Sequence, residues 1–486
     1  GPALDLGRLA AALDVVVARR DALRLVLTQD GTQRVLASVP GYVIATDDLR
    51  ALAAEEVALQ LERTRRALAH GARPVDEWPL FTVRASLLPG GRTRLHVDFD
   101  LLLADSQSLR LVMEDWRRAY LGEALAELPP IDFRACVLAG RRRDEARRQR
   151  DLEYWLARRP EFSPAPGLPL RSEPGELGRP GHTRRTGELS RAGWTRLRAA
   201  CRERGLTPAI VLCTAYVEVL LRWCDDEAFL LNLTHFTRPP VHERVGEVVG
   251  DFTSLLFLEC RRGEGASFTA RARAMQAQLR AHLEHESVSG VEVLRGWARE
   301  GLASTPPVVF TSTLGTSGTV EDGWNHDWLG EPVFALSQTP GVWLDNIVLA
   351  GGGRLMWCWD AVEGLFADGV VEAMLAAFGH RVASLAEGDA AWDDERVELL
   401  PAAALAELAG FNATGEGPEH AGTLAGRVAA RARSQASAPA IVAGELTIGY
   451  GELDRLATRL GRRLRGLGAG RGELVRQKAA VQTLKR

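Results

Sequence analysis

Helical and alternating patterns of apolar residues organise the first part of the chain into a small α+β unit. Apolar residues recur at helical spacing through 9–17, and the same spacing predicts longer helices at about 48–70 and 108–120. Paired apolar runs on either side of 30–31 and of 89–91, where Gly and Pro mark turns, predict two hairpins. In the second hairpin apolar positions alternate with His and Asp, so one face of it is expected to be polar.

The second part of the chain repeats this arrangement with more elements. Helical spacing predicts helices at about 191–204, 207–223, 268–285 and 367–387. Apolar runs predict strands at about 229–236, 253–260, 306–313, 341–350 and 354–361. Two α+β units of this size favour a pseudo-symmetric pair with a cleft between them.

A loop-rich link separates the two units. A basic helical stretch leads into PEFSPAPGLPL and RSEPGELGRPG, a run of about 20 residues that is long for one compact domain. We therefore expect a first lobe over 1–150 and a second over 151–400. Beyond 401 the pattern reads helix, short strand, helix and stops too soon to close a domain, so 401–486 is interpreted as a linker and the start of a further domain. The chain opens on Gly1-Pro2 instead of Met, and we expect a fragment, a processed chain or a tagged form.

Composition narrows the class of protein. Hydrophobic residues make up 46% and charged residues 25% of the 486 residues, as in ordinary globular domains. The formal net charge of −3 gives no basic footprint for nucleic acid. No apolar run approaches the roughly 18–20 residues of a membrane span, and no signal peptide opens the chain. The six cysteines form no CxxC pair, which indicates reduced, buried thiols in a cytoplasmic protein.

Polar residues stand at two kinds of unusual position. In DFDLLLADSQS, Asp100 ends a strand, and Asp105 and Ser108 follow across a turn into the next helix. Spacing alone favours a purely structural interpretation, in which Asp105 or Ser106 caps that helix. Asn232, Thr234, Thr311 and Asp345 lie in otherwise apolar strands. Each of these, taken singly, is more often a satisfied core group than a catalyst. The carboxyl group of Asp345 is expected to be either partnered or protonated, because an unpaired buried charge is costly.

Together these segments resemble the heterocyclization branch of the condensation domains of nonribosomal peptide synthetases. That branch replaces the HHxxxDG motif with DxxxxDxxS, here Asp100, Asp105 and Ser108, and Leu101 stands where the second His would be. The resemblance covers about residues 4–400 and continues through GLTPAIVLCTAYVEVLLRW, FLLNLTHFTRPP, VGDFTSLLFLE, SGVEVLRGWAR, PPVVFTST and SQTPGVWLDN. FNATG and LTIGYGELDRLATRLGRRLRGLG resemble the opening of an adenylation domain.

The resemblance implies an α+β fold of two chloramphenicol-acetyltransferase-like lobes, a pseudo-dimer around a central tunnel, followed by a partial adenylation segment. It implies amide formation between an upstream acyl thioester and a Cys, Ser or Thr thioester, and then cyclodehydration to a thiazoline or oxazoline. Both substrates would be attached as thioesters to the 4'-phosphopantetheine arms of donor and acceptor carrier proteins. The adenylation domain of the same synthetase is the other expected partner, and no directly bound cofactor, membrane or nucleic acid is expected.

The resemblance also assigns roles to particular residues. Asp345 and Thr311 would serve cyclodehydration, with Asp345 as the acid–base group and Thr311 orienting it or the leaving oxygen. Asp100, Asp105 and Ser108 are the other candidate catalytic residues. Asp100 and Asp105 would shape the tunnel centre or hold the lobes together instead of serving as bases, and a structural pairing of Asp105 with an Arg is the favoured interpretation. The residues expected to line the tunnel are Asn232, Thr234, Ser337 and Gln338.

Two departures from the family and two alternative functions remain. The family begins with another 30–40 residues bearing a motif of the type FPLxxxQxAYxxGR, and it has Gln where this chain has Gly341. One alternative is an ordinary amide-forming condensation domain, and the other is an inactive module that docks carrier proteins. His282 and His285 have no third ligand at suitable spacing, so we expect no metal site and interpret them as part of a solvated helix face.

Overall fold

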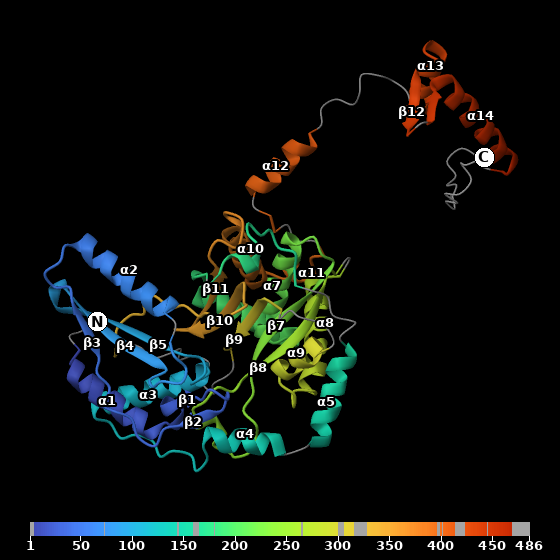
Figure 1. The fold of residues 1–486 in the computed structure, drawn as a ribbon. Helices are drawn as coiled ribbons and strands as arrows, with labels where there is room; N and C mark the ends of the chain where they lie inside the picture. Colours follow the sequence, from blue (N-terminus) through green and yellow to red (C-terminus); the bar gives the residue numbers. More distant parts are fainter. Residues whose placement is uncertain are drawn as a thin grey trace. The chain divides into compact units, whose positions relative to one another are not determined.

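The chain folds into two compact units, Gly1–Ala402 and Ala403–Arg486, which are described separately (Figure 1). The computed structural model describes residues 4–71, 73–142, 145–158, 165–178, 180–263, 266–299, 306–314, 328–395, 399–400, 402–413, 423–444 and 446–468. Part of the proline-rich link and the end of the FNATG motif lie outside these residues.

The first lobe of the larger unit has a three-stranded sheet in the order β3-β4-β5. Its elements are α1 (Leu6–Arg19), β1 (Leu25–Leu27), β2 (Gln33–Val35), β3 (Ala45–Asp48), α2 (Ala54–His70), β4 (Phe81–Leu88), β5 (Arg92–Phe99) and α3 (Ser106–Leu121), with 3₁₀ turns at Asp21–Arg24 and Pro89–Gly91. Both predicted hairpins are present as β1–β2 and β4–β5. The apolar faces of α1 and α3 pack on β4 in one core. The helix predicted from about residue 48 begins later, because β3 occupies the chain before it.

The second lobe is built on a six-stranded mixed sheet in the order β6-β11-β10-β9-β7-β8. Its strands are β6 (His182–Leu189), β7 (Ala228–Phe236), β8 (Thr253–Arg261), β9 (Val308–Ser312), β10 (Leu344–Gly351) and β11 (Arg354–Val362). Its helices are α4 (Phe133–Arg142), α5 (Glu145–Arg158), α6 (Arg191–Glu203), α7 (Pro208–Trp223), α8 (Phe268–Leu283), α9 (Gly290–Arg299), α10 (Val370–Glu387) and α11 (Ala390–Asp393), with 3₁₀ turns at Pro174–Glu176 and Val245–Glu247. The residue-150 boundary expected from the sequence falls inside α5, whose Trp155 packs in the second core.

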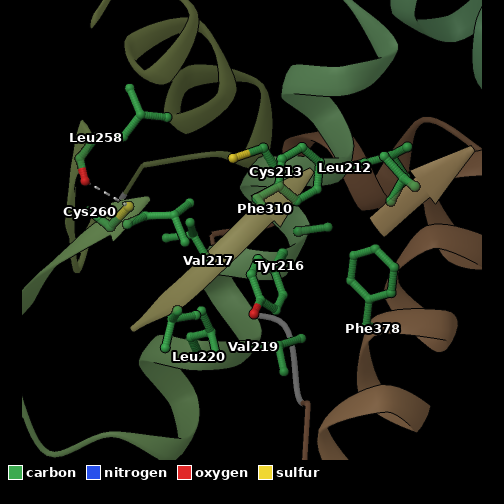
Figure 2. Packing of buried hydrophobic residues seen from close by; sticks show 14 of the residues in the cluster. Leu212, Cys213, Tyr216, Val217, Val219, Leu220, Leu258, Cys260, Phe310 and Phe378 are labelled. Carbon is green, nitrogen blue, oxygen red and sulfur yellow. Dashed lines mark hydrogen bonds between the residues drawn. The ribbon is translucent and has the colours of Figure 1, made fainter. Parts of the chain in front are cut away.

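Helix α7 is almost entirely buried and forms the centre of the second core. Figure 2 shows Tyr216 of this helix near Phe310 of β9 and Phe378 of α10. The ring centroid of Tyr216 lies 6.1 Å from that of Phe310 and 6.4 Å from that of Phe378. Cys213 and Cys260 are buried in the same cluster. All six cysteines are free; five are buried, as predicted, and Cys358 is partly buried. Apolar residues on both the strands and the helices therefore give this sheet a rigid, solvent-excluded back face.

One face of the sheet packs on helices, and the other carries the polar residues. In β10, Leu344 and Val348 are fully buried in the core, whereas Asp345 and Ile347 alternate with them and are only partly buried. Because successive side chains of a strand point to opposite faces, Asp345 faces away from α7 and α10.

The second unit contains α12 (Ala402–Asn412), which begins at the boundary, then α13 (Leu424–Ser434), β12 (Pro439–Ala443), β13 (Leu446–Gly449) and α14 (Tyr450–Gly466). The single strand predicted between two helices is a β12–β13 hairpin. Among the described helices no single one has the length and apolar composition to cross a membrane, although the bent pair α6 and α7 meets that test jointly.

Candidate active site

A row of polar side chains crosses the face of the second sheet that points away from α7 and α10. The strand register pairs Arg184 of β6 with Asp360 of β11, and Asp360 with Asp345 of β10. On the other side of β10, Thr311 of β9 pairs with Thr234 of β7. Directly paired residues share a face, so five neighbouring strands contribute to one row.

Thr311 is at the centre of a short chain of hydrogen bonds. Its Oγ1 lies 3.1 Å from Oδ1 of Asp345 and 2.9 Å from Oγ1 of Thr234. A threonine hydroxyl carries one proton, so Thr311 can donate to only one of the two partners at a time. When Asp345 is ionised, Thr311 donates to it and can accept from Thr234, and when Asp345 is protonated on Oδ1 it can donate to Thr311, which then donates to Thr234. The chain can therefore accommodate both protonation states of the carboxyl group.

The carboxyl group of Asp345 titrates near neutrality. Burial, and after it the neighbouring Asp360 carboxylate, raise the pKa of Asp345, whereas the Thr311 hydrogen bond and Arg184 lower it, and the net effect is a rise from 3.8 to about 7. Of the two predicted alternatives, a partnered or a protonated carboxyl group, the structure shows a partner, the hydroxyl of Thr311. A carboxyl group with such a pKa can both give and take a proton at physiological pH.

Arg184 and Asp360 form a buried ion pair beside Asp345 that the sequence analysis missed. Nε and Nη2 of Arg184 donate to the two carboxylate oxygens of Asp360 at 2.7 and 2.6 Å, and Asp360 is 1% exposed. The backbone N–H of Ser337 donates to the same carboxylate at 3.0 Å. An acid in the apolar run RLMWCWDA was the available signal for Asp360.

The segment after Ser337 connects the two lobes. Nε2 of Gln338 donates to the carbonyl of Ala69, near the end of α2, at 2.6 Å. Ser337 is held by Asp360, so the tunnel residues predicted from the SQTP motif lie between the second sheet and the first lobe. These contacts place the segment within reach of the Asp345 row.

Gly341, which stands where the family has Gln, occupies a tight turn. The Val342 N–H donates to the carbonyl of Thr339 at 3.1 Å, Pro340 takes the second position, and Gly341 has φ of 80°. This is the type II pattern, which favours Gly at the third position. A side chain there would meet no atom within 4 Å but would need a left-handed backbone.

Asn232 lies on the polar face two residues before Thr234. It is 3% exposed, and within the described part of the chain its Oδ1 has no hydrogen-bond partner. Buried polar atoms are nearly always paired, so an acceptor of this kind is a candidate for contact with substrate.

The DxxxxDxxS motif lies at the junction of the lobes, where its second acid is structural. Asp105 caps α3 by accepting a hydrogen bond from the Ser108 N–H at 2.7 Å, as the structural interpretation of the motif predicts. Arg238, on the segment between β7 and β8, donates to both oxygens of Asp105 at 2.6 and 3.1 Å, which confirms the alternative of an Arg partner. Ser108 Oγ donates to the carbonyl of Gly250 at 2.8 Å. Asp105 and Ser108 are buried, and their contacts join α3 to the second lobe.

Asp100 behaves differently from Asp105. It is partly buried, and Oδ1 accepts from the Leu102 N–H at 3.0 Å within the turn that follows β5. Leu101, which stands where the family's second His would be, is 48% exposed. Asp100 thus orders its own turn and makes no contact with the Asp345 row in the described contacts.

The interpretation of both histidines as a solvated face is wrong for His282. It is 1% exposed, with Nδ1 2.8 Å from the carbonyl of Phe257 and its ring centroid 4.8 Å from that of Trp155. His285 places Nδ1 2.9 Å from Asp151. Helix α5 covers this end of α8, which the helical pattern alone does not reveal. Among the described residues, no three His, Cys, Asp or Glu side chains are grouped closely enough to hold a metal ion.

Comparisons with known proteins agree with this geometry. The condensation-domain family model matches residues 1–308. Phenyloxazoline synthase MbtB of Mycolicibacterium paratuberculosis is 35% identical over 477 residues, or 97% of this chain and 40% of that protein. This chain spans less than half the length of such curated relatives.

Two solved structures are similar over most of the chain. The cyclization-docking bidomain of EpoB from Sorangium cellulosum has a TM-score of 0.74 at 34% identity, covering 81% of this chain and 79% of that one. The nonribosomal peptide synthetase FmoA3 has a TM-score of 0.77 at 34% identity, covering 97% of this chain and 49% of that one. The predicted α+β fold, related to that of chloramphenicol acetyltransferase, is confirmed. The chain belongs to the condensation-domain family, in the branch of the nonribosomal peptide synthetase cyclization domains.

Proposed function

We propose that this domain joins two carrier-bound substrates and then closes a five-membered ring. The amine of a cysteinyl, seryl or threonyl thioester attacks the upstream acyl thioester, which releases the donor thiol and forms an amide. The side-chain thiol or hydroxyl next adds to the amide carbon. Loss of the former amide oxygen as water leaves a thiazoline or oxazoline. The name of the relative phenyloxazoline synthase MbtB supports this ring class.

The raised pKa and the position of Asp345 are the observations that support this proposal most strongly. Ring closure needs a group that protonates a poor leaving oxygen and also accepts a proton, which requires a pKa near working pH. Asp345 has a pKa of about 7 and lies on the face opposite the apolar core. Oγ1 of Thr311 lies 3.1 Å from Oδ1 of Asp345 and orients the carboxyl group. When the donor and acceptor of this hydrogen bond exchange roles, those of the Thr311–Thr234 hydrogen bond can exchange as well.

The remaining site residues position the substrate. Asn232 has a buried acceptor that suits the amide N–H of the condensed intermediate. Thr234, Ser337 and Gln338 border the same region, in which we propose the central tunnel. Asp105 and Ser108 hold the two lobes together, and Asp100 shapes the turn that precedes them.

The partners follow from the chemistry of the substrates. Thioesters on 4'-phosphopantetheine arms require a donor and an acceptor carrier protein. For the second unit we propose the opening of an adenylation domain, since FmoA3, whose structure was solved with bound AMPPNP, matches 97% of this chain. Leu446 and Leu460 are more than half exposed in that unit, as expected if they pack on the rest of such a domain.

A reaction with two loaded carrier proteins tests the proposal. The acceptor carries a cysteinyl, seryl or threonyl group, and intact-mass analysis follows it over time. A product that has lost one water beyond the condensed mass supports ring formation. Condensed mass alone would indicate an ordinary condensation domain, and an unchanged acceptor would indicate a docking module.

A further inference from the structure

The contacts around Asp345 extend its site to a second pair of charges. Asp360 is the direct cross-strand partner of Asp345, so the two carboxyl groups project from neighbouring strands on the same face. Arg184 in turn is the cross-strand partner of Asp360 and makes a two-point ion pair with it. Both side chains are largely buried, with 15% of Arg184 and 1% of Asp360 exposed.

This ion pair is not required by packing alone. A buried ion pair is at best weakly stabilising, because desolvating both ions offsets their attraction. The adjacent residue of the same strand offers a contrast: Arg185 points to the opposite face and pairs with the exposed Glu372 at 2.7 Å. Of these two pairs, the Arg184–Asp360 pair is the one that has a carboxyl group of raised pKa as its neighbour and a backbone N–H from the SQTP segment as a further partner.

We propose that the Arg184–Asp360 ion pair is a positioning element, which sets the proton occupancy of Asp345 and anchors Ser337 beside it. The Asp360 carboxylate opposes ionisation of Asp345, and the Arg184 guanidinium favours it. The intact pair is nearly neutral and leaves Asp345 poised between its two states. The inference deepens the proposed function, on which it rests, by assigning two residues that act through Asp345.

Two single variants should move the pH dependence of ring closure in opposite directions. Arg184→Gln leaves the negative charge of Asp360 facing Asp345, so the inflection should move to higher pH. Asp360→Asn keeps an acceptor for the Ser337 N–H but leaves the positive charge of Arg184, so the inflection should move to lower pH. Each shift should be on the order of one pH unit. The double variant should return the inflection close to that of the parent.

The direction of these shifts does not depend on whether Asp345 acts as the acid or the base. Arg185→Gln is the matched control, and its inflection should match that of the parent. If Arg184→Gln does not fold, the downward shift in Asp360→Asn remains the test. The inference would be overturned if Arg184→Gln and Asp360→Asn left the inflection of the pH–rate profile unmoved, or if both moved it in the same direction.

A second readout separates this inference from the proposed function. Carbon-13 NMR of carboxyl-labelled Asp, with the Asp345 signal assigned by its loss in Asp345→Asn, follows its titration without any reaction. Opposite shifts of that titration support the ion pair's role even if no ring product forms. A parent that forms rings while the Asp345 titration stays unmoved in both variants would refute the inference and leave the function standing.

Discussion

Oγ1 of Thr311 lies 3.1 Å from Oδ1 of Asp345, and the two residues stand on adjacent parallel strands of the same sheet. They are 34 residues apart in the chain. The contact depends on the register, which pairs Thr311 with Ile347 and so places Asp345 two residues along on the same face. This geometry gives a titrating carboxyl group a fixed hydroxyl partner.

Thr311→Val should slow ring closure and shift its pH dependence upward. Valine keeps the shape of the side chain but removes a hydrogen bond that lowers the pKa of Asp345. A hydrogen bond to a charged group contributes about 1.5–3 kcal/mol, so the ring-forming rate should fall roughly 10- to 100-fold. Rates of water loss measured between pH 5 and pH 9 check both effects. Thr313→Val, two residues along, is the control, and an equal loss in that variant would contradict a specific role for Thr311.

Stability should depend on pH through Asp345. Its pKa is 3.8 in an unfolded chain and about 7 in the folded protein, so the folded protein binds more protons between these values. Stability from this group is therefore present below pH 4 and is lost as pH rises through 7. Asp345→Asn has no titrating carboxyl group at this position. The free energy of unfolding of the variant minus that of the parent should therefore increase by a few kcal/mol from pH 4 to pH 8.

Urea denaturation of both proteins across that pH range measures the effect. A stability difference that stays constant with pH would mean that the carboxyl group titrates normally, and the proposed acid–base role would lose its basis.

Asp105→Asn should destabilise the lobe junction strongly. It leaves the Arg238 guanidinium buried without its counter-ion, and breaking such a pair from one side costs about 3–5 kcal/mol. Asp48→Asn, which breaks the exposed pair with Arg50, should cost less than about 1 kcal/mol and serves as the control. Denaturation midpoints compare the two. Equal, small losses would show that Asp105 does not hold the lobes.

Most of the predicted elements have strong apolar patterns, and strand β6 was missed because it has none. Strand β6 reads HTRRTGEL, with polar residues on both faces, because it is an edge strand whose Arg184 belongs to an ion pair. No periodicity distinguishes such a strand from a loop. The sheet pairs β6 with β11, more than 160 residues away, and local patterns carry no information on that pairing.

The sequence pointed to Asp345 and to the acids of the DxxxxDxxS motif, but it did not point to Asp360 or to the partners of these acids. Asp345 stood out because a carboxyl group in an apolar strand has few satisfactory environments, and Thr311 stood out as a polar residue in another such strand. The sequence also suggested an Arg partner for Asp105 but could not identify Arg238, which lies 133 residues further along. Partners of this kind are set by tertiary packing, which local spacing does not encode.

The separation of the two chemical steps is tested most directly by Asp345→Asn. Asparagine keeps the shape of the side chain and removes the titrating proton. General acid–base catalysis contributes about 10²–10⁴-fold, so the ring product should nearly vanish while the uncyclised amide accumulates at close to the parent rate. Intact-mass analysis of loaded carrier proteins measures both products in one reaction. If the folded variant loses amide formation and ring closure equally, or keeps both, Asp345 is not the acid–base group of cyclodehydration.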